Sequence, residues 1–149
     1  MEFSALFQIS ASGMALEKLR VETTAANIAN MHVSAPSVDK VYRPLRVVAQ
    51  EARPAFAAQF NAMLSNQEGK AGAGGVTGAS VVPLETIPRL AYDPGHPHAD
   101  DKGYVAYPGV NHQDEMLQLV TALRAYEANV TAMNAARTMA ARALDIGGQ

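Results

Sequence analysis

The densest group of side chains capable of chemistry lies between residues 93 and 101. Two imidazoles and three carboxylates occur within nine positions there, in the run Asp93-Pro94-Gly95-His96-Pro97-His98-Ala99-Asp100-Asp101. A divalent metal ion could bind to such nitrogen and oxygen ligands. The spacing matches no strong metal-binding template, however, and Pro97 is expected to hold the two histidines in extended backbone, where their rings diverge. We therefore interpret the run as a structural turn and predict no metal site. The rival interpretation, a metal-dependent enzyme, would need His96 and His98.

Other routes to catalysis have little support in the sequence. Ser10, Ser12 and Ser34 lack the Gly-x-Ser-x-Gly setting of a nucleophile. The glycine-rich stretch 69–78 lacks the Lys-Ser/Thr pair that ends a phosphate-binding loop. The chain contains no cysteine, which excludes thiolate metal sites and a thiol nucleophile. The sequence thus predicts a protein that is not an enzyme, with no cofactor and no small-molecule substrate.

The composition limits both the partners and the core. Among 149 residues, 12 are Lys or Arg and 14 are Asp or Glu, and no basic run could neutralise several phosphates. Nucleic acid and anionic membranes are therefore poor candidates as partners. Although 48% of the residues are hydrophobic, there is no tryptophan and only 6% are aromatic. Many apolar residues are alanines, which bury little area, so we expect a thin core.

The amino-terminal residues do not show the pattern of a cleaved secretory signal. The first positively charged residue is Lys18, so no basic region precedes the apolar residues. No apolar span of about 20 residues occurs that could cross a membrane. If this protein leaves the cytoplasm, we expect it to use another export route.

A long helix is predicted over residues 4–30, which contain no proline and a single glycine. Every seventh residue is apolar, and Ala11 and Ala25 occupy the intervening positions, which Lys18 interrupts once. This pattern is typical of a coiled coil. The members of this amino-terminal stripe are Phe7, Met14, Val21 and Ile28. A second apolar set on another side of the helix is formed by Ile9, Leu16 and Leu19. A helix that is apolar on two sides needs more than one packing partner.

A second long helix is predicted over residues 111–149. Asn111 is a candidate N-cap, and Asp114 and Glu115 suit the positive end of the helix dipole. Apolar residues then follow in steps of three and four, interrupted by Arg137, until Gly147 and Gly148 end the helix. The members of this carboxy-terminal stripe are Met116, Leu119, Leu123, Tyr126, Val130, Met133 and Leu144, together with Ala140. The two stripes predict that the helices work as assembly interfaces.

The middle of the chain, residues 31–110, is punctuated by prolines that forbid long helices. The predicted elements are a strand over Tyr42–Gln50, a short helix over Pro54–Leu64, a mobile glycine-rich loop at 69–78, an extended stretch over Val81–Tyr92 and a closing strand over Tyr104–Tyr107. In the extended stretch, Pro83 and Pro88 indicate an edge strand rather than a central one. Turns are predicted at Asp93-Pro94-Gly95 and at Asp101-Lys102-Gly103. The predicted fold is therefore α+β and mainly α. Its helical arms, residues 1–30 and 111–149, pair as a coiled coil, and a small β-rich insert, residues 31–110, lies between them.

Five segments, taken in order, resemble the bacterial flagellar basal-body rod proteins. The resemblance covers nearly the whole chain, and Asn27, Ile28, Ala29 and Asn30 form its most recognisable element at the predicted end of the first helix. The segments are Asn27-Ile28-Ala29-Asn30, Tyr42-Arg43, Arg89-Leu90-Ala91-Tyr92-Asp93-Pro94-Gly95-His96-Pro97, Ala99-Asp100-Asp101-Lys102-Gly103-Tyr104-Val105 and Arg124-Ala125-Tyr126-Glu127-Ala128-Asn129-Val130. The chain departs from the common family pattern at Met31-His32, which leads into a longer segment, and in the glycine-rich stretch.

This resemblance implies a structural subunit of the proximal rod, the drive shaft that crosses the periplasm and surrounds an export channel. Implied partners are other flagellar rod proteins, the rod adaptor, the basal membrane ring and the flagellar type III export apparatus, together with self-association in a helical assembly. The implied location is the periplasmic rod of the basal body, reached without a cleaved signal peptide. In such axial proteins the two terminal helices pair as an inner layer.

Two hypotheses follow from the stripes. Each arm exposes an apolar stripe that the insert is too thin to cover, so we expect the monomer to be incompletely folded at its ends until it assembles. A soluble coiled-coil adaptor would share the stripes, but it would form a closed oligomer of fixed size rather than an open helical tube.

Overall fold

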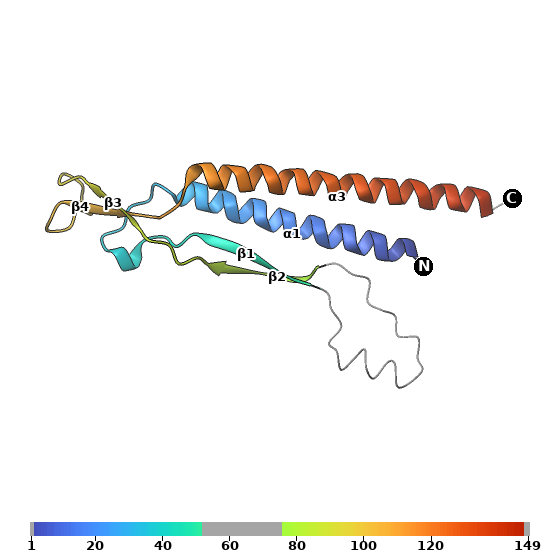
Figure 1. Ribbon diagram of the computed structural model, residues 1–149, viewed down its shortest axis with the longest axis horizontal. Coiled ribbons are helices and arrows are strands. Elements are labelled where there is room, and N and C mark those ends of the chain that lie inside the picture. Colours follow the sequence, from blue (N-terminus) through green and yellow to red (C-terminus); the bar gives the residue numbers. More distant parts are fainter. Residues whose placement is uncertain (1, 52–75, 148–149) are drawn as a thin grey trace, which may run out of the picture. The chain divides into compact units, whose positions relative to one another are not determined.

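A computed structural model describes residues 2–51 and 76–147 (Figure 1). These residues form a long helix towards each end of the chain and, between the helices in the sequence, two small sheets. In chain order the elements are α1 (Glu2–Asn30), a 3-10 helix η1 (Val38–Lys40), β1 (Leu45–Glu51), β2 (Val76–Pro83), β3 (Arg89–Tyr92), β4 (Tyr104–Tyr107) and α3 (His112–Gly147). The prediction of an α+β fold with long helices at both ends is confirmed.

Helix α3 begins where its cap was predicted. The Asn111 side-chain oxygen accepts a hydrogen bond of 3.0 Å from the backbone N–H of Gln113, and the Asn111 carbonyl accepts one of 3.1 Å from Glu115 N–H. These bonds satisfy donors that the first helical turn leaves without intrahelical partners. The predicted ends of the helices, Asn30 for α1 and Gly147 for α3, are confirmed as well.

Strands β1 and β2 are hydrogen-bonded neighbours in a two-stranded sheet. Just beyond β2, the Leu84 N–H donates a 2.7 Å hydrogen bond to the Pro44 carbonyl, immediately before β1. The strand predicted from Tyr42 actually begins at Leu45. Pro44 has no N–H to offer a sheet, and the Leu45 backbone is instead bonded to a side chain of α1, described below.

The extended stretch predicted over Val81–Tyr92 is wrong as a single element. Its first residues belong to β2 and its last four form β3, with residues 84–88 outside both strands. Pro83 and Pro88 flank this connection, and neither residue has an N–H for a ladder hydrogen bond. The two prolines therefore divide the stretch between two different sheets.

Strands β3 and β4 form an antiparallel hairpin in the register Arg89 with Tyr107 to Tyr92 with Tyr104. Both predicted turns and the predicted strand Tyr104–Tyr107 are confirmed. Asp100 stabilises the second turn, because its carboxylate accepts hydrogen bonds from the N–H groups of Lys102 at 2.9 Å and Tyr104 at 2.8 Å. Gly103 has a φ of 80°, a conformation that residues with a Cβ rarely adopt.

The chain forms two compact units, and each unit includes part of both long helices. Unit 1 comprises Met1–Lys18, Ala49–Ser80 and Arg124–Gln149, and unit 2 comprises Leu19–Val48 and Val81–Leu123. The buried apolar side chains of the described residues are few and mostly small, so the predicted thin core is confirmed. They are Leu16, Ala35, Val41, Val105, Ala106, Ala122 and Ala136. In unit 2, Ala35, Val41 and Ala106 form one cluster.

Two predictions fall partly or wholly outside the described residues. The short helix predicted over Pro54–Leu64 lies entirely outside them, and so do residues 69–75 of the predicted mobile loop. The remaining residues of that loop, 76–78, belong to β2.

Candidate functional site

The Asn27 side chain, in the last turn of α1, makes four hydrogen bonds to residues outside its own helix. It is 2% exposed, and its side-chain amide donates to the Leu45 carbonyl at 2.9 Å and to the Glu115 carboxylate at 3.1 Å. Its side-chain oxygen accepts hydrogen bonds from the Leu45 N–H at 2.8 Å and from the Tyr42 hydroxyl at 2.9 Å. This one side chain therefore joins the end of α1, the start of β1 and the first turn of α3.

The Tyr42 hydroxyl, which donates to Asn27, has a raised pKa. Its burial, and to a smaller extent the negative charge of Glu115, raises the pKa of Tyr42 above its usual value of 10.0. The hydroxyl therefore stays protonated as a donor to Asn27 across the neutral pH range. A tyrosinate would lose that donor and place a second negative charge near the Glu115 carboxylate.

The other residues of the Asn27–Asn30 motif end the helix locally. The Asn30 amide donates to the Ala26 carbonyl at 2.8 Å, and the Met31 N–H reaches the Ile28 carbonyl at 3.4 Å. Ile28 is partly buried and Ala29 is exposed. Both asparagines thus donate to backbone carbonyls, but only Asn27 reaches beyond its own helix.

The two helices approach each other closely within each unit. In unit 1, a Cβ built on Gly13 of α1 would lie 2.9 Å from the Asn129 side-chain oxygen of α3, so a side chain at this position would have to displace that of Asn129. In unit 2, the Asn27 to Glu115 hydrogen bond joins the same pair of helices. Small or polar residues thus occupy both of these helix contacts.

Low exposure repeats every seven residues on each helix, at positions that differ from the predicted stripes. We call these positions the inner seam. They are Ser10, Glu17 and Thr24 on α1, which are buried, and Ala122, Asn129 and Ala136 on α3, of which only Asn129 is partly exposed. The inner seam is therefore built of small and polar side chains, which contribute little apolar burial.

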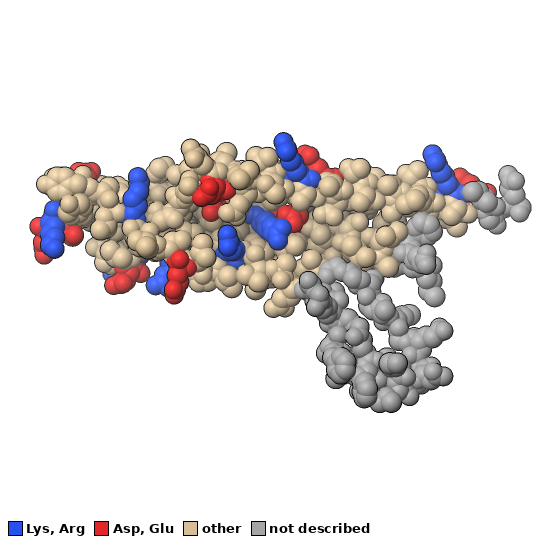
Figure 2. All heavy atoms as spheres, viewed as in Figure 1, with Lys and Arg blue, Asp and Glu red and all other residues tan. Residues whose placement is uncertain are grey.

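The predicted stripe residues lie beside the inner seam and none of them is fully buried. On α1, Phe7, Met14, Val21 and Ile28 are partly buried. On α3, Leu119, Val130 and Met133 are partly buried, and Met116, Leu123, Tyr126 and Leu144 are exposed, with Leu144 at 77%. On the face drawn in Figure 2, charged side chains of both signs are scattered, and other residues occupy most of the area. The helices thus retain apolar surface that the chain itself does not cover.

The two histidines do converge, contrary to the expectation that Pro97 would make them diverge. Their ring centroids are 5.4 Å apart, and Ser34 Oγ lies 3.0 Å from His98 Nδ1 and 3.5 Å from His96 Nε2. A tight turn brings this about, since the His98 N–H donates to His96 Nδ1 at 3.0 Å and the Ala99 N–H to the His96 carbonyl. The backbone is therefore folded here rather than extended.

This histidine pair is poorly arranged for a metal ion. Because His96 Nδ1 accepts the His98 N–H, the neutral ring carries its proton on Nε2, the nitrogen that faces Ser34. A metal at Nε2 would need that proton on Nδ1, opposite the N–H it now accepts. Across residues 2–51 and 76–147, moreover, no group of three or more His, Cys, Asp or Glu side chains is placed to hold a metal ion. The pair instead links the segment after α1 to the turn after β3.

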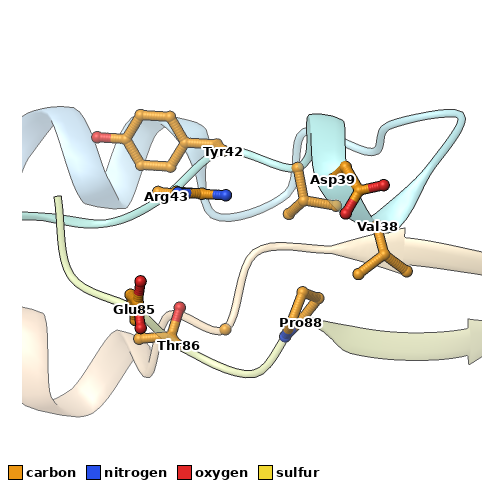
Figure 3. Close-up of a pocket in the computed structure, with 9 residues that line it drawn as sticks. Val38, Asp39, Tyr42, Arg43, Glu85, Thr86 and Pro88 are labelled. Carbon is orange, nitrogen blue, oxygen red and sulfur yellow. The ribbon is translucent and has the colours of Figure 1, made fainter.

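Unit 2 also contains a hollow of about 210 Å³ between residues 38–43 and residues 84–88 (Figure 3). Val38 and Pro88 supply apolar walls, and the charged groups are Asp39, Arg43 and Glu85. Gly109 also lines the hollow, and a Cβ on this residue would collide with the Ile87 carbonyl oxygen. The hollow therefore combines both signs of charge with apolar walls.

Two family models match the parts of the chain that carry these contacts. The model described as flagella basal body rod protein matches residues 7–34, most of α1 with the Asn27 motif. The model described as flagellar basal body rod FlgEFG protein C-terminal matches residues 101–146, which cover β4 and nearly all of α3.

Curated relatives extend the similarity over almost the whole chain. The flagellar basal-body rod protein FlgC of Bacillus subtilis (strain 168) is 37% identical over 143 residues, which cover 93% of this chain and 94% of the relative. The chain belongs to the FlgC family of flagellar basal-body rod proteins. FlgC of Borreliella burgdorferi is 34% identical over 97% of this chain and 96% of the relative. FlgC of Salmonella typhimurium is 32% identical over 95% of this chain and 96% of the relative. Recognition of the rod family from sequence motifs is confirmed.

Several contacts of this FlgC-family chain could not be recognised from its sequence. Glu115 was interpreted only as a dipole partner of α3, whereas it also binds Asn27 across 88 positions of sequence. Gly13 and Asn129 were not singled out. A signal for the inner seam exists in the seven-residue spacing of Ala122, Asn129 and Ala136, which a search for large apolar residues overlooks. Among the described helices, none combines the length and the apolar character that a membrane span requires.

Proposed function

We propose that this protein is a structural subunit of the proximal rod of the bacterial flagellum, which polymerises with other rod proteins into the shaft around the export channel. The observation that carries this proposal is the similarity to curated FlgC proteins over nearly the full length of both chains. The exposed apolar positions on the helices support it, because a chain with a thin core and uncovered apolar surface is suited to assembly.

In the proposed subunit, α1 and α3 pair as an antiparallel coiled coil. Two heptads, fourteen residues, separate Gly13 from Asn27 on α1, and fourteen residues also separate Glu115 from Asn129 on α3. Gly13 approaches Asn129 in one unit and Asn27 binds Glu115 in the other. Contacts that repeat in step with the heptad on two helices of opposite direction are what a coiled coil requires. The segment 31–110 is then the outer part of the subunit.

The predicted stripes become contacts between subunits in this proposal. The inner seam brings the two helices of one chain together, and the larger apolar side chains beside it, such as Leu123 and Val130, face neighbouring subunits. Order at the helix ends is gained on assembly, when this surface is covered. Proposed neighbours are other rod proteins, the rod adaptor and the basal membrane ring, and the proposed route of the subunit to the rod is the flagellar type III export apparatus.

Deletion of the gene tests the proposed function. We expect the deletion strain to lack rods, hooks and filaments in electron micrographs of isolated basal bodies, and the wild-type gene supplied in trans to restore all three. Complete rods in the deletion strain would refute the proposal. A closed oligomer of fixed size in light scattering of the purified chain, combined with normal rods, would favour the soluble adaptor instead.

A further inference from the structure

We propose that the hollow between residues 38–43 and 84–88 receives the β3–β4 turn of a second copy of this chain. The resulting head-to-tail contact links successive copies. This inference rests on the proposed function, since it needs a chain that polymerises, and it adds the identity of one contact between subunits.

The receiving side carries charges that need partners. Asp39 and Arg43 come from the segment around η1, and Glu85 comes from the connection between β2 and β3, so the charges line the hollow from two segments (Figure 3). All three side chains are exposed. Among residues 2–51 and 76–147, no hydrogen bond or ion pair joins these three side chains to another side chain. A partner that offers one positive and one negative group in close succession would complement all three.

The β3–β4 turn of unit 2 presents such a pair of charges. Asp101 and Lys102 are consecutive, opposite in sign and exposed. The turn that carries them is held by the Asp100 carboxylate and by the Gly103 N–H, which donates to the Asp100 carbonyl at 2.9 Å. Because the turn is already ordered, docking costs little conformational entropy. In the proposed contact, Lys102 of one copy forms ion pairs with Asp39 and Glu85 of the next copy, and Asp101 pairs with Arg43.

Apolar groups next to both charge sets strengthen the match. Beside the turn, Tyr92 and Tyr104 form an exposed edge-to-face pair with centroids 5.4 Å apart, and Tyr92 is 69% exposed. Beside the hollow, Ile87 is 91% exposed and Val38 is exposed as well. Tyrosines are enriched at the energetic centres of protein interfaces. The aromatic pair and the aliphatic pair would cover each other when the charges meet.

The geometry of the contact agrees with an open assembly. The turn and the hollow are different surfaces of the same unit, so one copy's turn fills the next copy's hollow and leaves a free turn and a free hollow at the two ends. Such heterologous contacts build open helical arrays unless the rotation closes a ring. The charges select the register, while most of the affinity comes from the apolar contacts.

Cysteine cross-linking between two variants of the full chain tests this contact, since the natural chain has no cysteine. Lys102→Cys and Glu85→Cys chains are mixed and oxidised, both as purified protein and when co-expressed in flagellated cells. We expect a disulfide-linked dimer that is several-fold more abundant than the dimer of Lys102→Cys with Asp114→Cys, a control at an exposed carboxylate of unit 2. Equal yields for the two pairs would overturn the proposal, as would Glu85→Cys cross-linking only to a different protein.

A charge exchange provides the second test and separates this inference from the proposed function. Lys102→Glu, added to the Asp101→Cys chain, should reduce its cross-link with the Arg43→Cys chain several-fold, and Glu85→Lys, added to the Arg43→Cys chain, should restore it. If the wild-type gene restores rods in the deletion strain but Lys102→Glu changes neither rods nor cross-linking, the contact is wrong and the rod function stands. If rods form without the gene, the rod function itself is wrong.

Discussion

The side-chain amide of Asn27 donates a 3.1 Å hydrogen bond to the carboxylate of Glu115, although the two residues are 88 positions apart in the sequence. The same side chain also donates to the Leu45 carbonyl and accepts a hydrogen bond from the Leu45 N–H. A residue that terminates one helix is thus bonded to the first turn of the other helix and to the first residue of a strand. This is the point at which the unit 2 segments of the two helical arms are joined by a specific polar contact.

Replacing Asn27 by alanine should lower the free energy of unfolding by about 2–4 kcal/mol, because buried donors and acceptors on three other residues lose their partner. Urea unfolding of the purified chain, followed by circular dichroism, measures this change. Asn30→Ala is the matched control, since the Asn30 amide bonds only a carbonyl of its own helix. Equal effects of the two substitutions would show that the long-range bonds of Asn27 add nothing.

Gly13 should be intolerant of a large side chain. Gly13→Leu must displace Asn129 of α3, and overpacking of this kind costs about 1–3 kcal/mol. Ala15→Leu, at an exposed position two residues along α1, should have little effect. Thermal unfolding of both variants decides the matter, and a Gly13→Leu variant as stable as Ala15→Leu would mean that the helices do not meet at this position.

Tyr42 should make the stability of the chain sensitive to alkaline pH. Its folded pKa is raised above 10.0, first by burial and then by the Glu115 charge. The folded chain therefore binds more protons than the unfolded chain above pH 10, and stability falls as pH rises through that range. Urea unfolding between about pH 9 and about pH 12 should show a smaller fall for Tyr42→Phe than for the natural chain. Tyr104→Phe serves as the control, and an identical pH dependence in all three chains would contradict this origin.

Zinc should not bind to the histidine pair. The hydrogen bond from the His98 N–H to His96 Nδ1 places the ring proton on the nitrogen that a metal would need. Titration calorimetry of the full chain with zinc chloride should give no heat beyond dilution. A saturable heat that disappears in the His96→Ala, His98→Ala double variant would restore the metal-dependent alternative.

The helices could be predicted from sequence because their signals are local. The signals for α3 are Asn111, the acidic first turn and the closing glycines, and each influences the backbone only a few residues away. The hairpin turn at Asp101-Lys102-Gly103 is likewise determined by its own residues. Prolines also act locally, yet Pro83 and Pro88 were interpreted as marks of one edge strand when they actually separate two strands. A proline without an N–H fits either an edge strand or a break between two strands. Only the strands that pair with this segment distinguish the two possibilities.

The contacts of the site could not be predicted in the same way, because they join distant segments. Nothing in the sequence near Asn27 indicates that Glu115 and Leu45 are its partners. The inner seam was overlooked because it consists of alanine, serine, threonine, asparagine and glutamate, whereas the heptad search counted large apolar residues. The convergence of His96 and His98 on Ser34 depends on a turn that Pro97 permits but does not specify.

The central claim is that the apolar stripe of α3 packs against neighbouring subunits in the rod. The most direct measurement is the amount of Leu123→Asp and Val130→Asp chains in basal bodies isolated from the deletion strain, compared with the amount exported. Both variants should be exported but nearly absent from rods, while Thr121→Asp, an exposed position on another face of the same helix, should be incorporated normally. Normal incorporation of the Leu123→Asp and Val130→Asp chains, with wild-type motility, would contradict the account.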